Sequence, residues 1–376
     1  MDVLIVIPAM SAEAGAETSL FEVMPHLLAS GFHLRVAVLT HHQGLVAELE
    51  RLDLPVHDLS GRTLVGRAMA LRTLIDRTDP DLVHATLFQA SLPTQLASLG
   101  RRRPILVTWA STPVDPRAEG RTPWKVRLVE LSDALMGRAS RSRFHAVTPG
   151  VARSKGTALR VDPARVRVAE RGRDPERFGA ADPDARRRTR SELGLADGDV
   201  AVLAVGRHEP EKGYADLLPA FDEVAAGNAH VRLLVAGRTG TATAWIEALA
   251  AGLAAADRVT LLGHRSDVPD LLRAADVMVC ASTREGAAGA VIEAMASGTP
   301  IVSVRLVGLE GIVEDGVNAI VVEREQLAAG IRRAIDDLAS AADLADRATA
   351  TFAERFTLSG SASALGEVYR WAAGPE

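Results

Sequence analysis

The hydrophobic residues of the chain alternate between short unbroken apolar runs and stretches in which they recur at helical spacing. Short β-branched runs of this kind are typical of parallel strands that are buried on both faces. Helical spacing is clearest over Thr18–Ala29. The predicted strands are Val3–Ile7, Leu34–Leu39, Asp81–His84, Ile105–Thr108 and Phe144–Val147, followed by Val200–Val205, Val231–Ala236, Val259–Leu262, Val277–Cys280, Ile301–Val304 and Ala319–Val322. This alternation predicts an α/β fold with helices on both faces of parallel sheets.

A polar stretch divides the pattern in two. Residues Ala169–Asp199 are rich in charge, proline and glycine, which predicts a domain boundary. We expect Rossmann-like domains at 1–170 and 171–355, facing each other across a cleft, and a C-terminal helix at 356–376 that packs back toward the first domain. The arginines of 186–190 indicate either a solvated linker helix or a nucleic-acid patch, and the neighbouring acids favour the helix.

Composition narrows the possible classes of protein. The 376 residues are 47% hydrophobic and 24% charged, with a net charge of −5, which excludes a disordered chain and argues against nucleic-acid binding. The lone cysteine, Cys280, excludes a disulfide framework and is expected to be a buried thiol. The apolar run at Val3–Ile7 has no basic leader and is too short to span a bilayer, so we expect a cytoplasmic protein.

The loop Gly206–Gly213 directly follows a predicted strand and carries two cations, Arg207 and Lys212. We expect Gly206 to let the backbone turn sharply at the strand end. The next helix, starting at Tyr214, presents backbone N–H groups that favour an anion. These features indicate a diphosphate site, and the alternative is an ordinary surface loop with solvated charges.

A second candidate loop holds two carboxylates and two glycines. Glu285 and Glu293 flank Gly286 and Gly289 after the strand that ends at Cys280. If a helix begins near Gly289, Glu293 lies about one turn into it and can face the same cleft as Glu285. Carboxylates accept hydroxyl hydrogens, which suits recognition of a ribose and a sugar. The alternative is a helix whose acidic first turn merely complements its dipole.

Seven ordered segments resemble the family-4 glycosyltransferases, which have the GT-B fold, and the resemblance extends over nearly the full chain. The segments are Gly15-Ala16-Glu17, Asp81-Leu82-Val83-His84, Val147-Thr148-Pro149-Gly150-Val151, Gly172-Arg173-Asp174-Pro175-Glu176-Arg177-Phe178, Gly206–Gly213, Gly263-His264-Arg265-Ser266-Asp267-Val268, and Glu285 to Glu293 running on to Pro300.

The resemblance implies a retaining, metal-independent enzyme that uses a nucleotide-diphosphate sugar and no cofactor. It implies catalytic roles for Glu285, Arg207 and Lys212, with the two cations holding the diphosphate. The other implied donor-binding residues are small residues that allow close approach, a base-framing pair and a ribose-binding carboxylate. They are Gly15, Ala16, Gly206, Gly289, Ala290, His264, Arg265 and Glu293. The acceptor is expected mainly in the first domain, where His84 and Ala110 are candidates.

The sequence also departs from the family pattern. Ala110 stands where members commonly carry a histidine that meets the donor sugar, and Thr86 replaces the second histidine of a His-x-His pair. Ala287-Ala288 replaces the usual Phe-Gly. These departures keep two alternatives open: a non-catalytic descendant that binds a nucleotide sugar, and a GT-B nucleotide-sugar epimerase.

Membrane contact is a further expectation, because Arg117–Arg143 combines Trp124 with several basic residues. Basic first-domain helices of this kind dock some family members on membranes, and the alternative is a solvated helix of mixed charge. The base, the sugar, the acceptor and the oligomeric state stay open.

Overall fold

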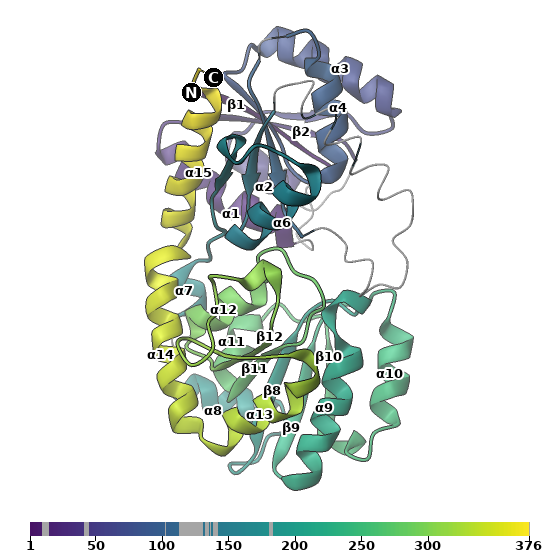
Figure 1. Ribbon diagram of the computed structural model, residues 1–376, viewed down its shortest axis with the longest axis vertical. Coiled ribbons are helices and arrows are strands. Elements are labelled where there is room, and N and C mark those ends of the chain that lie inside the picture. The colour runs from purple at the N-terminus through teal and green to yellow at the C-terminus, as the bar shows by residue number, and fades with distance from the viewer. Residues whose placement is uncertain are drawn as a thin grey trace. The chain divides into compact units, whose positions relative to one another are not determined.

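The computed structural model describes residues 1–9, 15–40, 45–101, 103–112, 131, 135, 137, 142–179 and 183–375. The segment Arg117–Arg143, expected to contact membranes, lies largely outside these residues. The chain divides into two compact units: unit 1 comprises Met1–Gly172 and Leu358–Glu376, and unit 2 comprises Arg173–Thr357. Both units are α/β (Figure 1).

The described part of unit 1 contains a seven-stranded parallel sheet with strand order β3-β2-β1-β4-β5-β6-β7. Its strands are β1 (Asp2–Ile7), β2 (His33–Val38), β3 (Val56–Asp58), β4 (Leu82–Ala85), β5 (Ile105–Trp109), β6 (Arg143–Ala146) and β7 (Val166–Val168). Its helices are α1 (Gly15–Ala29), α2 (Val46–Arg51), α3 (Leu64–Thr78), α4 (Phe88–Ser98), α6 (Pro149–Leu159) and α15 (Leu358–Ala373). The order reverses between β1 and β4, which is the topological switch point of this sheet.

The described part of unit 2 contains a six-stranded parallel sheet with strand order β10-β9-β8-β11-β12-β13. Its strands are β8 (Val200–Val205), β9 (Val231–Ala236), β10 (Val259–Gly263), β11 (Val277–Cys280), β12 (Ile301–Val304) and β13 (Ile320–Val322). Its helices are α7 (Pro175–Phe178), α8 (Pro183–Glu192), α9 (Tyr214–Gly227), α10 (Thr243–Ala251), α11 (Val268–Ala274), α12 (Gly289–Ser297), α13 (Leu327–Asp336) and α14 (Leu338–Arg355). The switch point here lies between β8 and β11.

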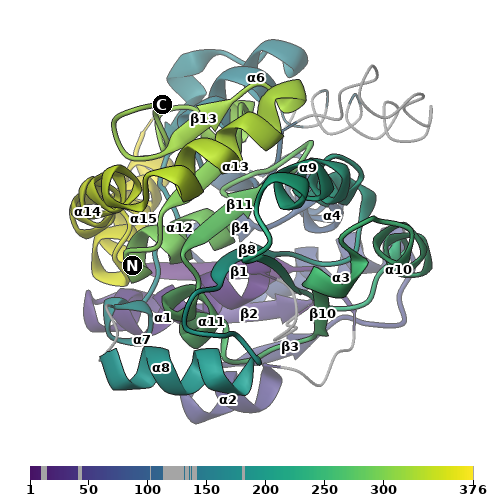
Figure 2. The same ribbon diagram turned by 90° about the horizontal axis from the view of Figure 1, so that it is seen from below.

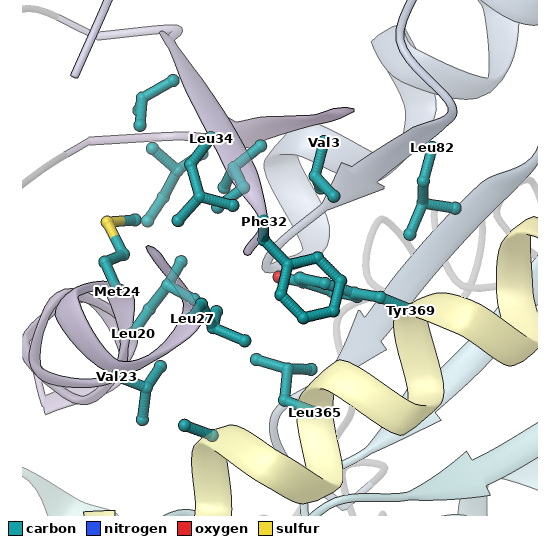
Figure 3. Close-up of a cluster of buried hydrophobic side chains, with 14 of the residues drawn as sticks. Val3, Leu20, Val23, Met24, Leu27, Phe32, Leu34, Leu82, Leu365 and Tyr369 are labelled. Atoms are coloured by element: carbon teal, nitrogen blue, oxygen red, sulfur yellow. The ribbon is translucent and has the colours of Figure 1, made fainter. Parts of the chain in front are cut away.

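Helix α15 is part of the core of unit 1 although it is last in the sequence. Leu358, Ala362, Leu365 and Tyr369 recur at helical spacing and are buried. This face packs on α1 and beside Phe32, with the Tyr369 ring edge-on to Phe32 at 5.7 Å between centroids (Figure 3). Helices α1 and α15 therefore pack together over the same face of the sheet of unit 1.

Residues 186–190 lie in helix α8, which has no buried residue, so the predicted solvated helix is present, but two of its arginines form ion pairs that the sequence did not indicate. Helix α8 lies against α11 in unit 2 (Figure 2). The Arg190 guanidinium donates to Oδ2 of Asp276 at 3.0 Å, and Arg186 donates to Oδ1 at 2.5 Å. Asp276 also accepts the backbone N–H of Ala201 at 2.7 Å. Arg186 and Arg190 therefore anchor α8 to Asp276.

Replacing Asp276 with asparagine is expected to lower the free energy of unfolding by about 2–3 kcal/mol, because it leaves two arginines without their shared carboxylate. The side chain of Asp276 is 15% exposed, which places the effect below that of a fully buried pair. Denaturant unfolding measures the change. Asp184→Asn is the matched control, since it breaks an exposed pair with Arg187 on the same helix and should change stability by less than about 1 kcal/mol. Equal effects of the two substitutions would contradict an anchoring role.

Candidate functional site

The candidate site in unit 2 is built by the loops that follow β8 and β11, the two strands that flank the switch point. Ligands of doubly wound sheets bind at the carboxyl ends of such strands. The loop after β8 contains Lys212 and leads into α9, and the loop after β11 contains Glu285 and leads into α12. The topology thus brings together two segments that are far apart in the sequence.

Lys212 and Glu285 form an ion pair between these two loops. The Nζ atom of Lys212 donates to Oε1 of Glu285 at 2.6 Å, and the Ser282 hydroxyl donates to the same oxygen at 2.7 Å. The side chains are 22% and 13% exposed, so the pair is largely shielded from water. A shielded pair of this kind interacts more strongly than one at the surface, and its ammonium is available to a second anion that approaches from solvent.

A cavity of about 40 Å³ adjoins this pair. Its lining includes Lys212, Glu285, Gly289 and Ala290, and also Cys280, whose burial raises the pKa of the thiol. A space of this size holds a water molecule or the edge of a larger group. The structure therefore brings together four of the residues that the resemblance implied for the donor.

The backbone around Lys212 is fixed by close approach of two loops. Gly213 has φ +72°, and a Cβ there would overlap the backbone carbonyl oxygen of Ala281. The chain bends at Gly206 directly after β8, as the sequence predicted, although the φ of Gly206 is not positive. The carbonyl oxygen of Gly206 accepts the Tyr214 hydroxyl at 2.6 Å and lies where a Cβ on Gly237 would be. The left-handed residue that ends the loop is Gly213.

Other predicted donor residues lie outside the lining of this cavity. Arg207 is 48% exposed and donates to Glu209 at 3.4 Å and to Glu211 at 3.3 Å. His264 is exposed, and Arg265 donates from Nε to Asp267 at 2.7 Å. The Asp267 carboxylate accepts hydrogen bonds from this guanidinium, which lowers the pKa of Asp267.

Glu293 does not line the cavity that Glu285 lines. Helix α12 begins at Gly289, as the sequence predicted, and Glu293 lies about one turn into it. Its Oε1 atom accepts the Nε–H of Arg173 at 2.7 Å. Sequence reasoning gave Arg173 no role, because nothing in a linear pattern pairs two residues 120 positions apart.

His208 is a second residue that sequence reasoning passed over. It is 3% exposed, and neither ring nitrogen has a hydrogen-bond partner among the described residues. Its ring meets Tyr214 edge-on, with centroids 5.7 Å apart, and burial lowers its pKa. His208 is therefore neutral near pH 7 and adds no charge to the loop.

In unit 1, His84 belongs to a buried hydrogen-bonded chain. Its Nδ1 lies 2.9 Å from the Tyr369 hydroxyl, and its Nε2 lies 2.6 Å from Oγ1 of Thr108. Thr108 in turn lies 2.9 Å from Nδ1 of His145, whose Nε2 lies 2.9 Å from the carbonyl oxygen of Ala169. A carbonyl oxygen only accepts, so His145 donates from Nε2 and accepts at Nδ1 from the Thr108 hydroxyl. Thr108 then accepts from Nε2 of His84, and Nδ1 of His84 accepts from the Tyr369 hydroxyl.

This assignment requires both histidines to be neutral. Burial lowers the pKa of His84 well below its usual value, and His145 adds to the effect. Burial lowers the pKa of His145 to about 4, opposed by the hydrogen bond to Ala169 and aided by Arg171. The sequence left His84 as an acceptor-side candidate. The structure shows that both of its ring nitrogens are engaged.

The free energy of unfolding should fall as the pH drops from about 6.5 to about 4. In that range the unfolded chain protonates His145 and the folded chain does not, so acid favours unfolding. The difference amounts to about 3 kcal/mol for His145 alone. His145→Gln should flatten this dependence, and the control His26→Gln, on the exposed surface of α1, should not. Denaturant unfolding at several pH values measures both, and an unchanged slope in His145→Gln would contradict the assignment.

A cavity of about 50 Å³ adjoins these hydrogen-bonded side chains at the carboxyl ends of β1, β4 and β5. Its lining includes Ser19, His84, Thr86 and Glu170. Ala110 follows β5 directly, is half-buried and is outside this lining. Gly15 and Ala16 are the first two residues of α1.

Two findings bear on metals and membranes. Within the described residues, no three histidine, cysteine, aspartate or glutamate side chains gather as a metal ion would need. No helix in the described part of the chain combines the length and the apolar character needed to cross a bilayer.

The two doubly wound parallel sheets, each with helices packed against it, have the topology expected of the GT-B fold. Residues 14–177 match the family model Glycosyltransferase Family 4, and residues 185–351 match Glycosyl transferases group 1. Over both units the chain is therefore similar to the glycosyltransferases that these two models describe.

Curated relatives match part of the chain. A D-inositol 3-phosphate glycosyltransferase of Geodermatophilus obscurus is 35% identical over 222 residues, which are 52% of this chain and 49% of that protein. An α-D-kanosaminyltransferase of Streptomyces kanamyceticus is 29% identical over 201 residues, 52% of each chain. The chain thus spans about half the length of the curated relatives that it matches.

Solved structures show the same fold over the whole chain. HepE of Anabaena, solved in complex with UDP and glucose, has a TM-score of 0.83 at 22% identity and covers 99% of this chain and 100% of its own. The expected GT-B fold is confirmed.

Proposed function

We propose that the protein transfers a sugar from a nucleotide-diphosphate sugar to a hydroxyl or amine of an acceptor, with retention and without a metal ion. The observation that carries the proposal is the Lys212–Glu285 pair at the switch point of unit 2. A diphosphate that reaches this pair meets an ammonium that is already positioned and partly desolvated, so little reorganisation is needed.

The chemistry follows from charge. The bond from the sugar C1 to the diphosphate oxygen breaks, a new bond from C1 to the acceptor oxygen or nitrogen forms, and the acceptor proton passes to the departing diphosphate. Lys212 offsets the negative charge that develops on the leaving group, and Glu285 contacts the sugar hydroxyls. Catalysis is then mainly positioning and electrostatic stabilisation.

UDP-sugars are the first donors to test, because the similar fold of HepE was solved with UDP and glucose. D-inositol 3-phosphate is the first acceptor, because relatives that share about a third of their aligned residues carry that name. The first donors and the first acceptor to be tested are therefore UDP-sugars and D-inositol 3-phosphate.

Calorimetric titration with UDP, GDP and ADP tests the proposal, followed by mass spectrometry of nucleotide sugars incubated with and without acceptor. We expect one nucleoside diphosphate to bind, and glycosylated acceptor to form. No affinity for any of the three would overturn the proposal. Binding without turnover over the acceptor panel would favour the non-catalytic alternative, and a sugar isomer formed without acceptor would favour an epimerase.

A further inference from the structure

Arg173, the first residue of unit 2, is a buried arginine that is paired with a carboxylate. It is 7% exposed, and its Nε–H donates to Oε1 of Glu293 at 2.7 Å. The two side chains are 9% and 16% exposed, so the ion pair is largely removed from water. An arginine held in this way fixes the plane of the carboxylate that it contacts.

Arg173 is held by the segment Phe356–Thr357 and lies against the start of α12. Its backbone N–H donates to the carbonyl oxygen of Phe356 at 2.8 Å, and it forms an isolated parallel bridge with Thr357. A Cβ on Gly289, at the start of α12, would overlap Nη2 of Arg173. Gly289 therefore makes room for the guanidinium, a requirement separate from the ligand approach that the sequence suggested.

The pair leaves Glu293 with capacity for hydroxyl groups. An ionised carboxylate has about four acceptor positions on its two oxygens, and the hydrogen bond from Arg173 uses one. The guanidinium also fixes the orientation of the carboxylate. A carboxylate held in this way is a good partner for two neighbouring hydroxyls, such as those of a ribose.

We propose that Arg173 is a positioning residue that holds Glu293 against the ribose of the donor and thereby sets a preference for ribonucleotides over 2′-deoxyribonucleotides. This rests on the proposed function, because it requires a nucleotide donor. Arg173 acts through Glu293 and does not contact the reacting atoms.

The experiment compares the full-length protein with Arg173→Met and Glu293→Gln. The probe is whichever of UDP, GDP and ADP the wild type binds, together with its 2′-deoxy counterpart and inorganic pyrophosphate. We expect the wild type to bind the ribonucleotide about tenfold or more tightly than the deoxy form, and both variants to bring that ratio close to one. Pyrophosphate affinity should stay within about twofold, because Lys212 and Glu285 are unchanged.

Controls separate positioning from folding. Arg187→Met removes a guanidinium that is 72% exposed elsewhere in unit 2 and should keep the wild-type ratio. Arg173→Lys, which keeps the charge without the Nε–H, replaces Arg173→Met if that variant does not fold, and it too should lose the discrimination.

The contrary outcomes are distinct. A wild-type ratio near one, or a variant at Arg173 that keeps the ratio while Glu293→Gln loses it, would overturn the inference and leave the proposed function standing. Parallel loss of pyrophosphate binding would show that Arg173 merely supports the fold, which also overturns it. No binding of any nucleoside diphosphate by the wild type would overturn the proposed function itself.

Discussion

Replacing Lys212 with methionine is expected to lower donor turnover by about 100- to 1000-fold, the effect of removing one preorganised group that stabilises developing negative charge. The substitution removes the ammonium that lies 2.6 Å from Glu285 and leaves that carboxylate without its cation. It should also weaken nucleoside diphosphate binding about ten- to hundredfold, the effect of one lost charge-assisted contact. Release of free nucleotide from a nucleotide sugar measures turnover, and calorimetry measures binding.

Arg207→Met is the matched comparison in the same loop. Arg207 is half-exposed and donates to two carboxylates of its own loop, so solvent and those carboxylates screen its charge. We expect a loss of about tenfold or less. A larger effect at Arg207 than at Lys212 would mean that the diphosphate binds along the outer side of the loop, and the assignment of the switch-point pair as its site would be wrong.

Replacing Gly213 with alanine is expected to destabilise unit 2 by several kcal/mol and to abolish nucleotide binding. The added Cβ would overlap the carbonyl oxygen of Ala281, which is backbone and is fixed next to β11. The left-handed φ of +72° adds about 1–2 kcal/mol of strain. The loops after β8 and β11 would have to separate, and Lys212 and Glu285 would separate with them.

Gly316→Ala is the control for this substitution. Gly316 has the same φ of +72°, in the same unit, and nothing lies within 4 Å of its added Cβ. Its substitution should cost only the strain, about 1–2 kcal/mol. Denaturant midpoints compare the two variants. If both substitutions lowered the stability by similar amounts, Gly213 would not be needed for the close approach of the two loops.

The sequence predicted the local parts of the fold well, because apolar runs and glycine-bounded loops are local signals. The loops after β8 and β11, and the start of α12 at Gly289, were found in this way. The strands β3 and β7 were missed, because Val56–Asp58 and Val166–Val168 are three residues long and lie at the sheet edges, only partly buried. Short exposed strands have little hydrophobic pattern to recognise.

The parts of the site that the sequence missed depend on contacts between distant residues. The pairing of Arg173 with Glu293 and of Tyr369 with His84 spans 120 and 285 positions. Lone histidines, tyrosines and arginines are common and fit many environments, so their positions alone indicate no partner. The ion pairs of Arg186 and Arg190 were missed for the same reason, since Asp276 lies far along the chain.

The position of α15 in the sequence has a consequence for biosynthesis. Unit 2 is inserted between β7 and α15, so a ribosome makes all the strands of unit 1 and then the whole of Arg173–Thr357 before the helix that carries Tyr369. Until then Phe32 and His84 lack their aromatic neighbour, and the nascent chain exposes apolar surface that invites aggregation or a chaperone. Unit 2, by contrast, is one continuous stretch and can fold while it emerges.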